Sequence, residues 1–153
     1  MAIESAGIDV VVNNLGSWPV QEDLLARGCR EALNAEGIGE GEVSVTLMDD
    51  EGIRGLNQEY FGKSRPADVI AFSLQAPGDP VLGDIYLGYE QARRQSDELD
   101  ILLDEELLRL VIHGTLHVLG YQHPDGEERL ESPMFMKQEE LLRRVLESEA
   151  ARE

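Results

Sequence analysis

The order of hydrophobic and polar positions predicts a chain in which strands alternate with helices. β-Branched runs and strict alternation predict strands over residues 8–12, 42–48, 69–74 and 85–89. Apolar residues at helical spacing predict helices from Trp18-Pro19 up to Gly37 and over residues 51–60, 104–119 and 132–147, and a polar helix is expected over residues 90–97. This order predicts one α/β (α+β) domain, with a small mixed sheet of about four strands packed with helices.

Five residues carry more specific expectations about these segments. Asp104 is expected to cap the longest apolar helix at its start, and Gly120 to end it. Pro133 suits the first position of the last helix, where a missing N–H costs nothing. Cys29 lies on the apolar face of the first helix and Tyr60 on that of the second, so both are expected to point inward.

Composition excludes several classes of protein. Hydrophobic residues make up 42% and charged residues 29%, and no apolar run approaches the roughly 20 residues that span a bilayer. With no signal-peptide pattern and a single cysteine, the expected compartment is the cytoplasm, with no membrane partner. The net charge of −18 is spread along the chain, which argues against a general nucleic-acid coat but leaves room for a local basic site.

The chemistry concentrates in one short segment, HGTLHVLGYQH, which holds all three histidines of the chain. His113 and His117 are four residues apart, so both rings lie on one face of a helix, and a turn at Gly120 can bring His123 to the same ion. Three neutral imidazoles with an open fourth position are typical of catalytic zinc, which lowers the pKa of bound water to about 7. Nickel, cobalt and copper also suit such ligands.

A peptidase of the metzincin type is disfavoured by the same segment. Those enzymes carry a glutamate directly after the first histidine, where it serves as general base. This chain has Gly114 there, so that mechanism lacks its base.

The histidine segment resembles the H-G-x-L-H-L-x-G-Y-D-H signature of the YbeY family, bacterial metal-dependent endoribonucleases that act in ribosomal RNA maturation. The resemblance continues over most of the chain and in the same order. It includes Leu56-Asn57-x-x-Tyr60, PADVIAFS at 66–73, LGDI at 82–85, and Met134-Phe135 with Gln138-Glu139-Glu140.

The resemblance implies a single YbeY-like metal-hydrolase domain over residues 1–153. It implies one Zn²⁺ per chain, with His113, His117 and His123 as ligands that act in catalysis through the metal. It further implies hydrolysis of single-stranded RNA, maturation of the 16S rRNA 3′ end and ribosome quality control. The small ribosomal subunit and its assembly factors are the partners implied.

Two positions depart from the family pattern. Gln122 stands where the family usually has aspartate, and Phe61 stands where it usually has an arginine after the tyrosine. Lys63 and Arg65 form the nearest positive patch in sequence. Either they contact phosphate in place of that arginine, which is our hypothesis, or they are solvated charges of the loop.

No general base is identified by the sequence. Asp68, Asp84 and Asp125 are candidates by residue type and by neighbourhood, although each also suits a cap, a turn or a structural acceptor. The nucleophile is either water activated by the metal or the 2′-hydroxyl of the RNA.

Two alternatives stay open beside the nuclease. The chain could be a ribosome assembly factor with a mainly structural metal site and little catalysis, which the loss of an arginine at Phe61 favours. It could instead be a zinc hydrolase of another substrate.

Overall fold

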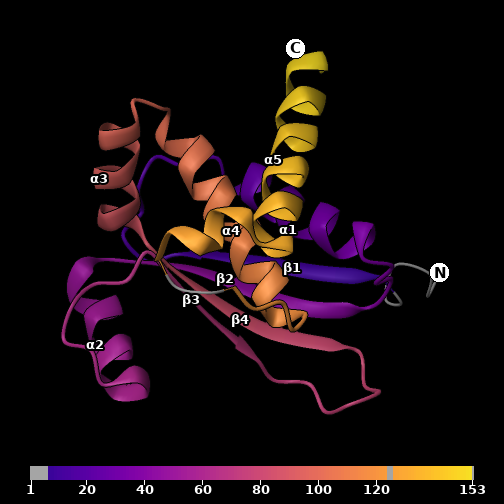
Figure 1. Ribbon diagram of the computed structural model, residues 1–153, viewed down its shortest axis with the longest axis horizontal. Coiled ribbons are helices and arrows are strands. Elements are labelled where there is room, and N and C mark those ends of the chain that lie inside the picture. The colour runs from indigo at the N-terminus through magenta and orange to yellow at the C-terminus, as the bar shows by residue number, and fades with distance from the viewer. Residues whose placement is uncertain (1–6, 124–125, 153) are drawn as a thin grey trace.

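A four-stranded mixed sheet organises the chain (Figure 1). The computed structural model describes residues 7–123 and 126–152. Its strands are β1 (Ile8–Asn14), β2 (Gly41–Met48), β3 (Val69–Ser73) and β4 (Val81–Gly88). They lie in the order β1-β2-β4-β3, with β1, β2 and β4 parallel and β3 antiparallel to β4. The predicted α/β domain with a small mixed sheet is confirmed.

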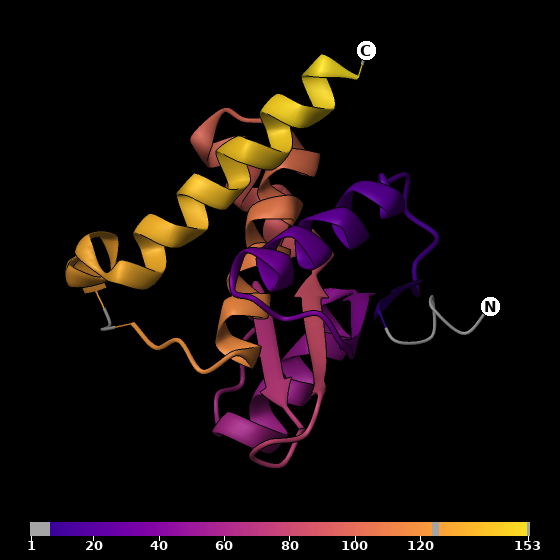
Figure 2. The same ribbon diagram turned by 90° about the vertical axis from the view of Figure 1, so that its right-hand side faces the viewer.

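Helices cover one face of this sheet in two layers, and the helix over residues 50–61 packs against the opposite face (Figures 1 and 2). The helices are α1 (Glu22–Ala35), α2 (Asp50–Phe61), α3 (Tyr89–Leu99), α4 (Leu103–Val118) and α5 (Pro133–Ala151), with a short 3₁₀ helix η2 (Gly126–Glu131) before α5. α1 contacts β1, α4 contacts β3 and β4, and α5 lies across α4 and α1 on the side away from the sheet. Among the described residues, none of the helices is long and apolar enough to cross a lipid bilayer.

The core lies between the sheet and α1 and α4. Strand alternation puts Val43, Val45 and Leu47 of β2 on the helix side, where each is at most 2% exposed. Leu108 and Ile112 of α4 meet this layer and are fully buried. The hydrophobic periodicity therefore fixes which face of α4 is buried and which is left for polar side chains.

Two glycines set how deeply α4 sits on the sheet. A Cβ atom at Gly83 of β4 would lie 2.7 Å from Val118 Cγ1, and one at Gly114 of α4 would lie 2.8 Å from Ile85 Cγ2. Both distances are shorter than real Cβ contacts. The absence of side chains here lets α4 lie close to β4, which fixes the position of the histidine-bearing face.

Two boundaries were predicted wrongly because side chains compete for the backbone. α1 begins at Glu22 rather than at Trp18, since the Asn14 side chain accepts from Trp18 N–H (3.0 Å) and donates to Trp18 O (2.8 Å), which holds a loop. Asp104 does not cap α4: Leu102 takes that position, and Asp104 accepts from the side chain of Gln21 at 2.9 Å.

The bounds of β4 and α5 and the position of Tyr60 also differ from those predicted, whereas the burial of Cys29 is confirmed. β4 begins at Val81, earlier than the predicted residue 85, and α5 continues to Ala151. Tyr60 does not point inward: it is 55% exposed, with its ring against that of Phe72. Cys29 is fully buried, as predicted, and burial raises the pKa of its thiol to about 11.

The predicted helix ends at Gly120 and Pro133 are confirmed. Gly120 has φ 101° directly after the end of α4, a conformation that glycine adopts without strain. Pro133 is the first residue of α5, and Ser132 caps that helix by accepting from Phe135 N–H at 3.2 Å.

Candidate metal centre

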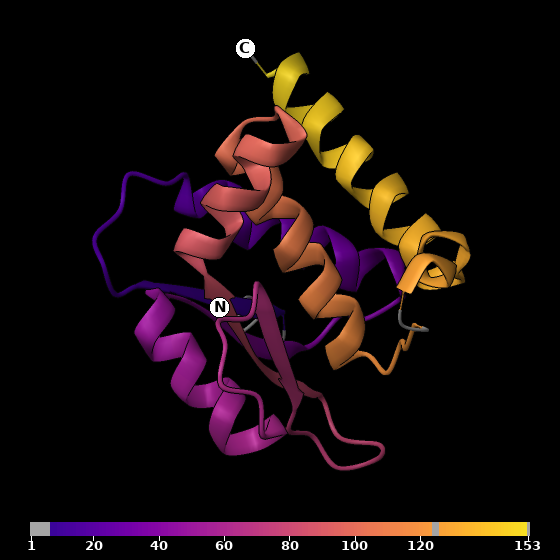
Figure 3. The ribbon, with the colours of Figure 1, turned by 60° about the vertical axis from the view of Figure 1, so that its left-hand side comes forward.

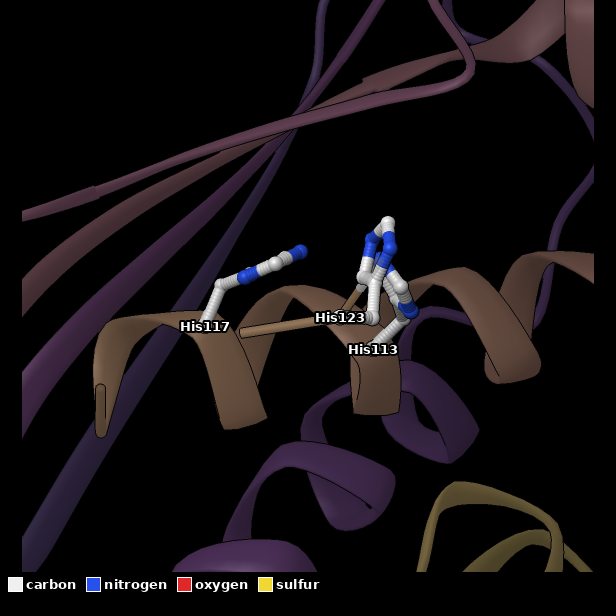
Figure 4. A group of neighbouring side chains, drawn as sticks. All are labelled: His113, His117 and His123. Carbon is white, nitrogen blue, oxygen red and sulfur yellow. The ribbon is translucent and has the colours of Figure 1, made fainter. Parts of the chain in front are cut away.

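The three histidines come together at the end of α4 and form what we name the histidine cluster: His113, His117 and His123 (Figure 4). One ring nitrogen from each lies within 4.8 Å of the others. The ring centroids of His113 and His117 are 4.6 Å apart, and each is 5.2 Å from that of His123. This convergence is the geometry that a shared metal ion requires.

A tight turn after α4 makes this convergence possible. Gly120 N–H donates to His117 O (2.9 Å) and Tyr121 N–H to Leu116 O (3.0 Å), the two bonds of a Schellman motif. The turn reverses the chain and returns His123 toward the helix face that carries His113. It is anchored from outside, because Tyr121 OH donates to Glu36 Oε1 at 2.7 Å.

Hydrogen bonds assign the proton on two of the rings. His117 Nδ1 lies 2.9 Å from Tyr121 O, and since a carbonyl can only accept, Nδ1 carries the hydrogen. His113 Nδ1 lies 2.6 Å from Gln138 Oε1, while Gln138 Nε2 donates to Glu139 Oε2 at 2.9 Å. Both rings therefore present an unprotonated Nε2, the form in which histidine binds a metal.

Burial keeps these two rings neutral. It lowers the pKa of His113, and it lowers the pKa of His117 to about 4, with the neighbouring His113 acting in the same direction. Near pH 7 no proton has to be displaced from either ring before a cation binds. Three imidazole donors suit a divalent ion of borderline softness, so the residues present fit the metal expected from the sequence.

A buried polar network supports His113 from behind. Glu139, which accepts from Gln138, also accepts from Arg109 Nε at 2.9 Å, and Arg109 Nη1 donates to Glu106 Oε1 at 2.7 Å. Glu106 is 3% exposed and Gln138 is 5% exposed. The network ties the ring of His113 to α5, an element distant in sequence.

The histidine cluster opens into a pocket of about 920 Å³. Figure 3 shows α4 running between β3 on one side and η2 on the other. β3 and the loop before it contribute Lys63, Asp68 and Val69, whereas η2 and α5 contribute Arg129 and Phe135. The pocket thus brings together segments that are distant in the sequence, such as those that carry Lys63 and Arg129.

The structure separates the sequence candidates for phosphate contact. Lys63 lines the pocket, whereas Arg65 is exposed and is not among its described lining residues. Phe61 is 52% exposed and stacks on Phe72 at 6.3 Å, again away from the pocket lining. Of the two cations proposed from sequence, Lys63 is the one that lines the pocket holding the histidine cluster.

The candidates for general base are separated in the same way. Asp68 lines the pocket, and its Oδ1 accepts from Val69 N–H at 2.7 Å. Asp84 accepts from Ser44 Oγ at 2.7 Å, on the opposite face of the sheet from the core residue Ile85. Asp125 lies outside the described residues.

Gly114 stands at the position of the metzincin glutamate, and Gln122 at the position where the YbeY family usually has aspartate. Gly114 is packed against Ile85 and Val69 of the sheet, so the position that holds the metzincin glutamate has no space for a side chain. Gln122 is exposed. Neither position supplies a group to the pocket lining.

Sequence reasoning assigned no role to Gln138, Arg109 or Arg129. Gln138 had a usable signal, because it is a polar residue within the buried stripe of α5 formed by Met134, Leu141, Leu142 and Val145. Arg109 and Arg129 had none, since an arginine on a helix is usually just solvated. Their places follow only from how η2 and α5 fold back over α4.

Comparison with known proteins gives consistent matches over nearly the whole chain. The family model described as Endoribonuclease YbeY matches residues 14–146. The curated Endoribonuclease YbeY of Pelotomaculum thermopropionicum is 42% identical over 149 residues, which cover 89% of this chain and 96% of that protein. The one from Bacillus subtilis is 42% identical over 147 residues, 86% of this chain and 91% of that protein.

A solved structure agrees with the fold. The solution structure of TM1509 from Thermotoga maritima superposes with a TM-score of 0.63 at 28% sequence identity. The match covers 95% of this chain and 93% of that one.

Proposed function

Because this chain belongs to the endoribonuclease YbeY family, we propose that it is a metal-dependent endoribonuclease in which the histidine cluster holds one zinc ion. The observation that carries the proposal is the convergence of His113, His117 and His123 in a pocket, with Nε2 of the first two free to bind. A bound ion supplies Lewis-acid stabilisation of the negative charge that develops on a phosphodiester under attack.

The residues around the histidine cluster have separable roles in this proposal. Lys63 lies in the same pocket and attracts the substrate phosphate. Asp68 is the acidic candidate that shares this pocket, and it accepts a proton from the attacking water or 2′-hydroxyl. Gln138 and the Tyr121 carbonyl hold the rings of His113 and His117 in one orientation.

The proposed substrate is single-stranded RNA, in particular the 3′ end of the 16S rRNA precursor. Family membership supports RNA as the substrate, and the curated relatives are named endoribonucleases. We extend this to ribosome quality control in the cytoplasm, in contact with the small subunit and its assembly factors.

Two measurements on untagged protein test the proposal. Elemental analysis is expected to find about one zinc per chain in the wild type and none in a folded His117→Ala variant. Wild type is expected to cut an end-labelled single-stranded RNA faster than the same RNA in a duplex, and His117→Ala is expected to cut neither. A folded wild type that takes up no metal after incubation with zinc would overturn the proposal.

One alternative function rests on a specific observation. Phe61 offers no positive charge and lies away from the pocket, which favours an assembly factor whose metal site is mainly structural. Bound metal without RNA cleavage would support that alternative. In that case His117→Ala would lower thermal stability without changing any RNA product.

A further inference from the structure

An RNA-binding pocket in a chain of net charge −18 needs cations that are not already neutralised. The described residues place three cationic side chains in the pocket lining: Lys63, Arg109 and Arg129. Their availability to a phosphate differs, because a guanidinium held by carboxylates has little attraction left for another anion.

Arg109 is already paired with carboxylates of the protein itself. Its guanidinium contacts Glu106 at 2.7 Å, Glu139 at 2.9 Å and Glu105 at 3.6 Å. Three carboxylates around one cation leave this part of the pocket negative. Arg109 therefore supports the network behind His113 and does not bind substrate.

Arg129 is in the opposite situation. It lines the same pocket from η2, is exposed, and forms no ion pair with the described residues. Its backbone is held, since Arg129 O accepts from Ser132 Oγ (2.7 Å) and Ser132 N–H (3.2 Å) at the start of α5.

Lys63 approaches from the other side of the pocket, and it too is exposed and forms no ion pair with the described residues. Asn57, which is 6% exposed, holds its loop at two points. Lys63 N–H donates to Asn57 O (3.3 Å), and Asn57 Nδ2 donates to Arg65 O (2.9 Å). Both cations thus stand on anchored backbone and line the pocket that holds the histidine cluster.

Building on the proposed function, we infer that Arg129 and Lys63 bind the phosphate backbone of the RNA strand from two sides of the pocket that holds the histidine cluster. Arg129 supplies a planar fork that matches two phosphate oxygens, and Lys63 supplies a point charge. The carboxylates around Arg109 repel phosphate from their part of the pocket, so the strand's backbone is confined to the part that Arg129 and Lys63 line.

The test measures RNA binding separately from cleavage. Metal-free protein in EDTA is titrated into a fluorescent single-stranded RNA, and anisotropy is followed over a series of KCl concentrations. The variants are Arg129→Ala, Lys63→Ala, the conservative Arg129→Lys, and the control Arg30→Ala, which removes the same charge from an exposed position on α1. Circular dichroism verifies that each variant is folded.

Arg129→Ala and Lys63→Ala are each expected to weaken binding about fivefold to tenfold. Each is also expected to lower the slope of log K against log salt by about 0.7, the value for one phosphate contact on a single strand. Arg129→Lys should recover part of the affinity, and Arg30→Ala should stay within about twofold of wild type, because general attraction to a strand is shared by all charges.

Two outcomes would contradict this inference, and they distinguish the phosphate site from the proposed function. If wild type binds the RNA but Arg129→Ala matches Arg30→Ala in both affinity and slope, the phosphate site is wrong and the proposed function stands. If wild type neither binds nor cleaves single-stranded RNA, the proposed function fails and the phosphate site fails with it.

Discussion

Replacing Gln138 by leucine tests whether the network behind His113 serves the metal. The variant keeps the approximate volume of a side chain that is 5% exposed and removes the acceptor 2.6 Å from His113 Nδ1. It therefore leaves a partly buried N–H without its partner. It also breaks the link through Glu139 to Arg109.

The expected loss of metal affinity follows from comparing two states of the ring. A hydrogen bond from a neutral group contributes about 0.5–1.5 kcal/mol, and one involving a charged group about 1.5–3 kcal/mol. When His113 binds a cation, its ring gains positive charge, so its hydrogen bond to Gln138 changes from the neutral kind toward the charged kind. The difference of about 1.4 kcal/mol corresponds to a tenfold loss, the lower end of the ~10–100-fold known for outer partners of metal ligands.

The assay is competition for zinc against a chromophoric chelator at pH 7.5, with thermal unfolding of the metal-free proteins as a check on folding. Gln138→Glu keeps an acceptor at the same place, so its affinity should match or exceed that of wild type. Gln95→Leu makes the same chemical change at the far end of the network, where Gln95 donates to Glu106 at 2.8 Å, and should alter affinity less than about threefold. Equal affinity of Gln138→Leu and wild type, or equal losses in both leucine variants, would refute the reasoning.

Three further predictions follow from the same geometry. Asp68→Asn should lower kcat for RNA cleavage about 100-fold with unchanged metal content, while Asp84→Asn, on the other face of the sheet, should stay within about twofold; equal effects would remove Asp68 as base. Burial lowers the pKa of His117 to about 4, so on acidification the unfolded chain protonates first, near pH 6.5. The metal-free protein should therefore lose stability between pH 6.5 and 4, and urea midpoints of His117→Gln should decline less over that window. Gly114→Ala should cost about 1–3 kcal/mol in urea unfolding, because its Cβ would meet Ile85 Cγ2 at 2.8 Å. Gly55→Ala, with nothing within 4 Å, should be neutral or stabilising, and equal effects would contradict the close-packing argument.

Features that depend only on residues close together in the sequence could be predicted from the sequence. The histidine cluster lies within one segment of eleven residues, so helical spacing and one glycine turn were enough to predict its convergence. Helix ends at Gly120 and Pro133 were predicted correctly for the same reason, because each follows from the residue's own backbone preferences.

Features that depend on distant segments could not be predicted in this way. The loop before α1 is held by Asn14, whose side chain competes with the helix start, and nothing local reveals that bond. Tyr60 has helical spacing but lies where α2 leaves the core, so its ring meets Phe72 at the surface. Arg129 and Gln138 reach the pocket only because η2 and α5 return to α4 after the turn.

The closeness of the three histidines in sequence has a thermodynamic consequence for how the metal stabilises the fold. Donors within eleven residues can share an ion in the unfolded chain as well, at a small cost in loop closure. A ligand that also binds the unfolded state raises stability by less than its affinity for the native state suggests. Zinc should therefore increase Tm less than its measured Kd indicates, and a growing chain can acquire the ion once residue 123 has emerged, before α5 delivers Gln138 to complete the support of His113.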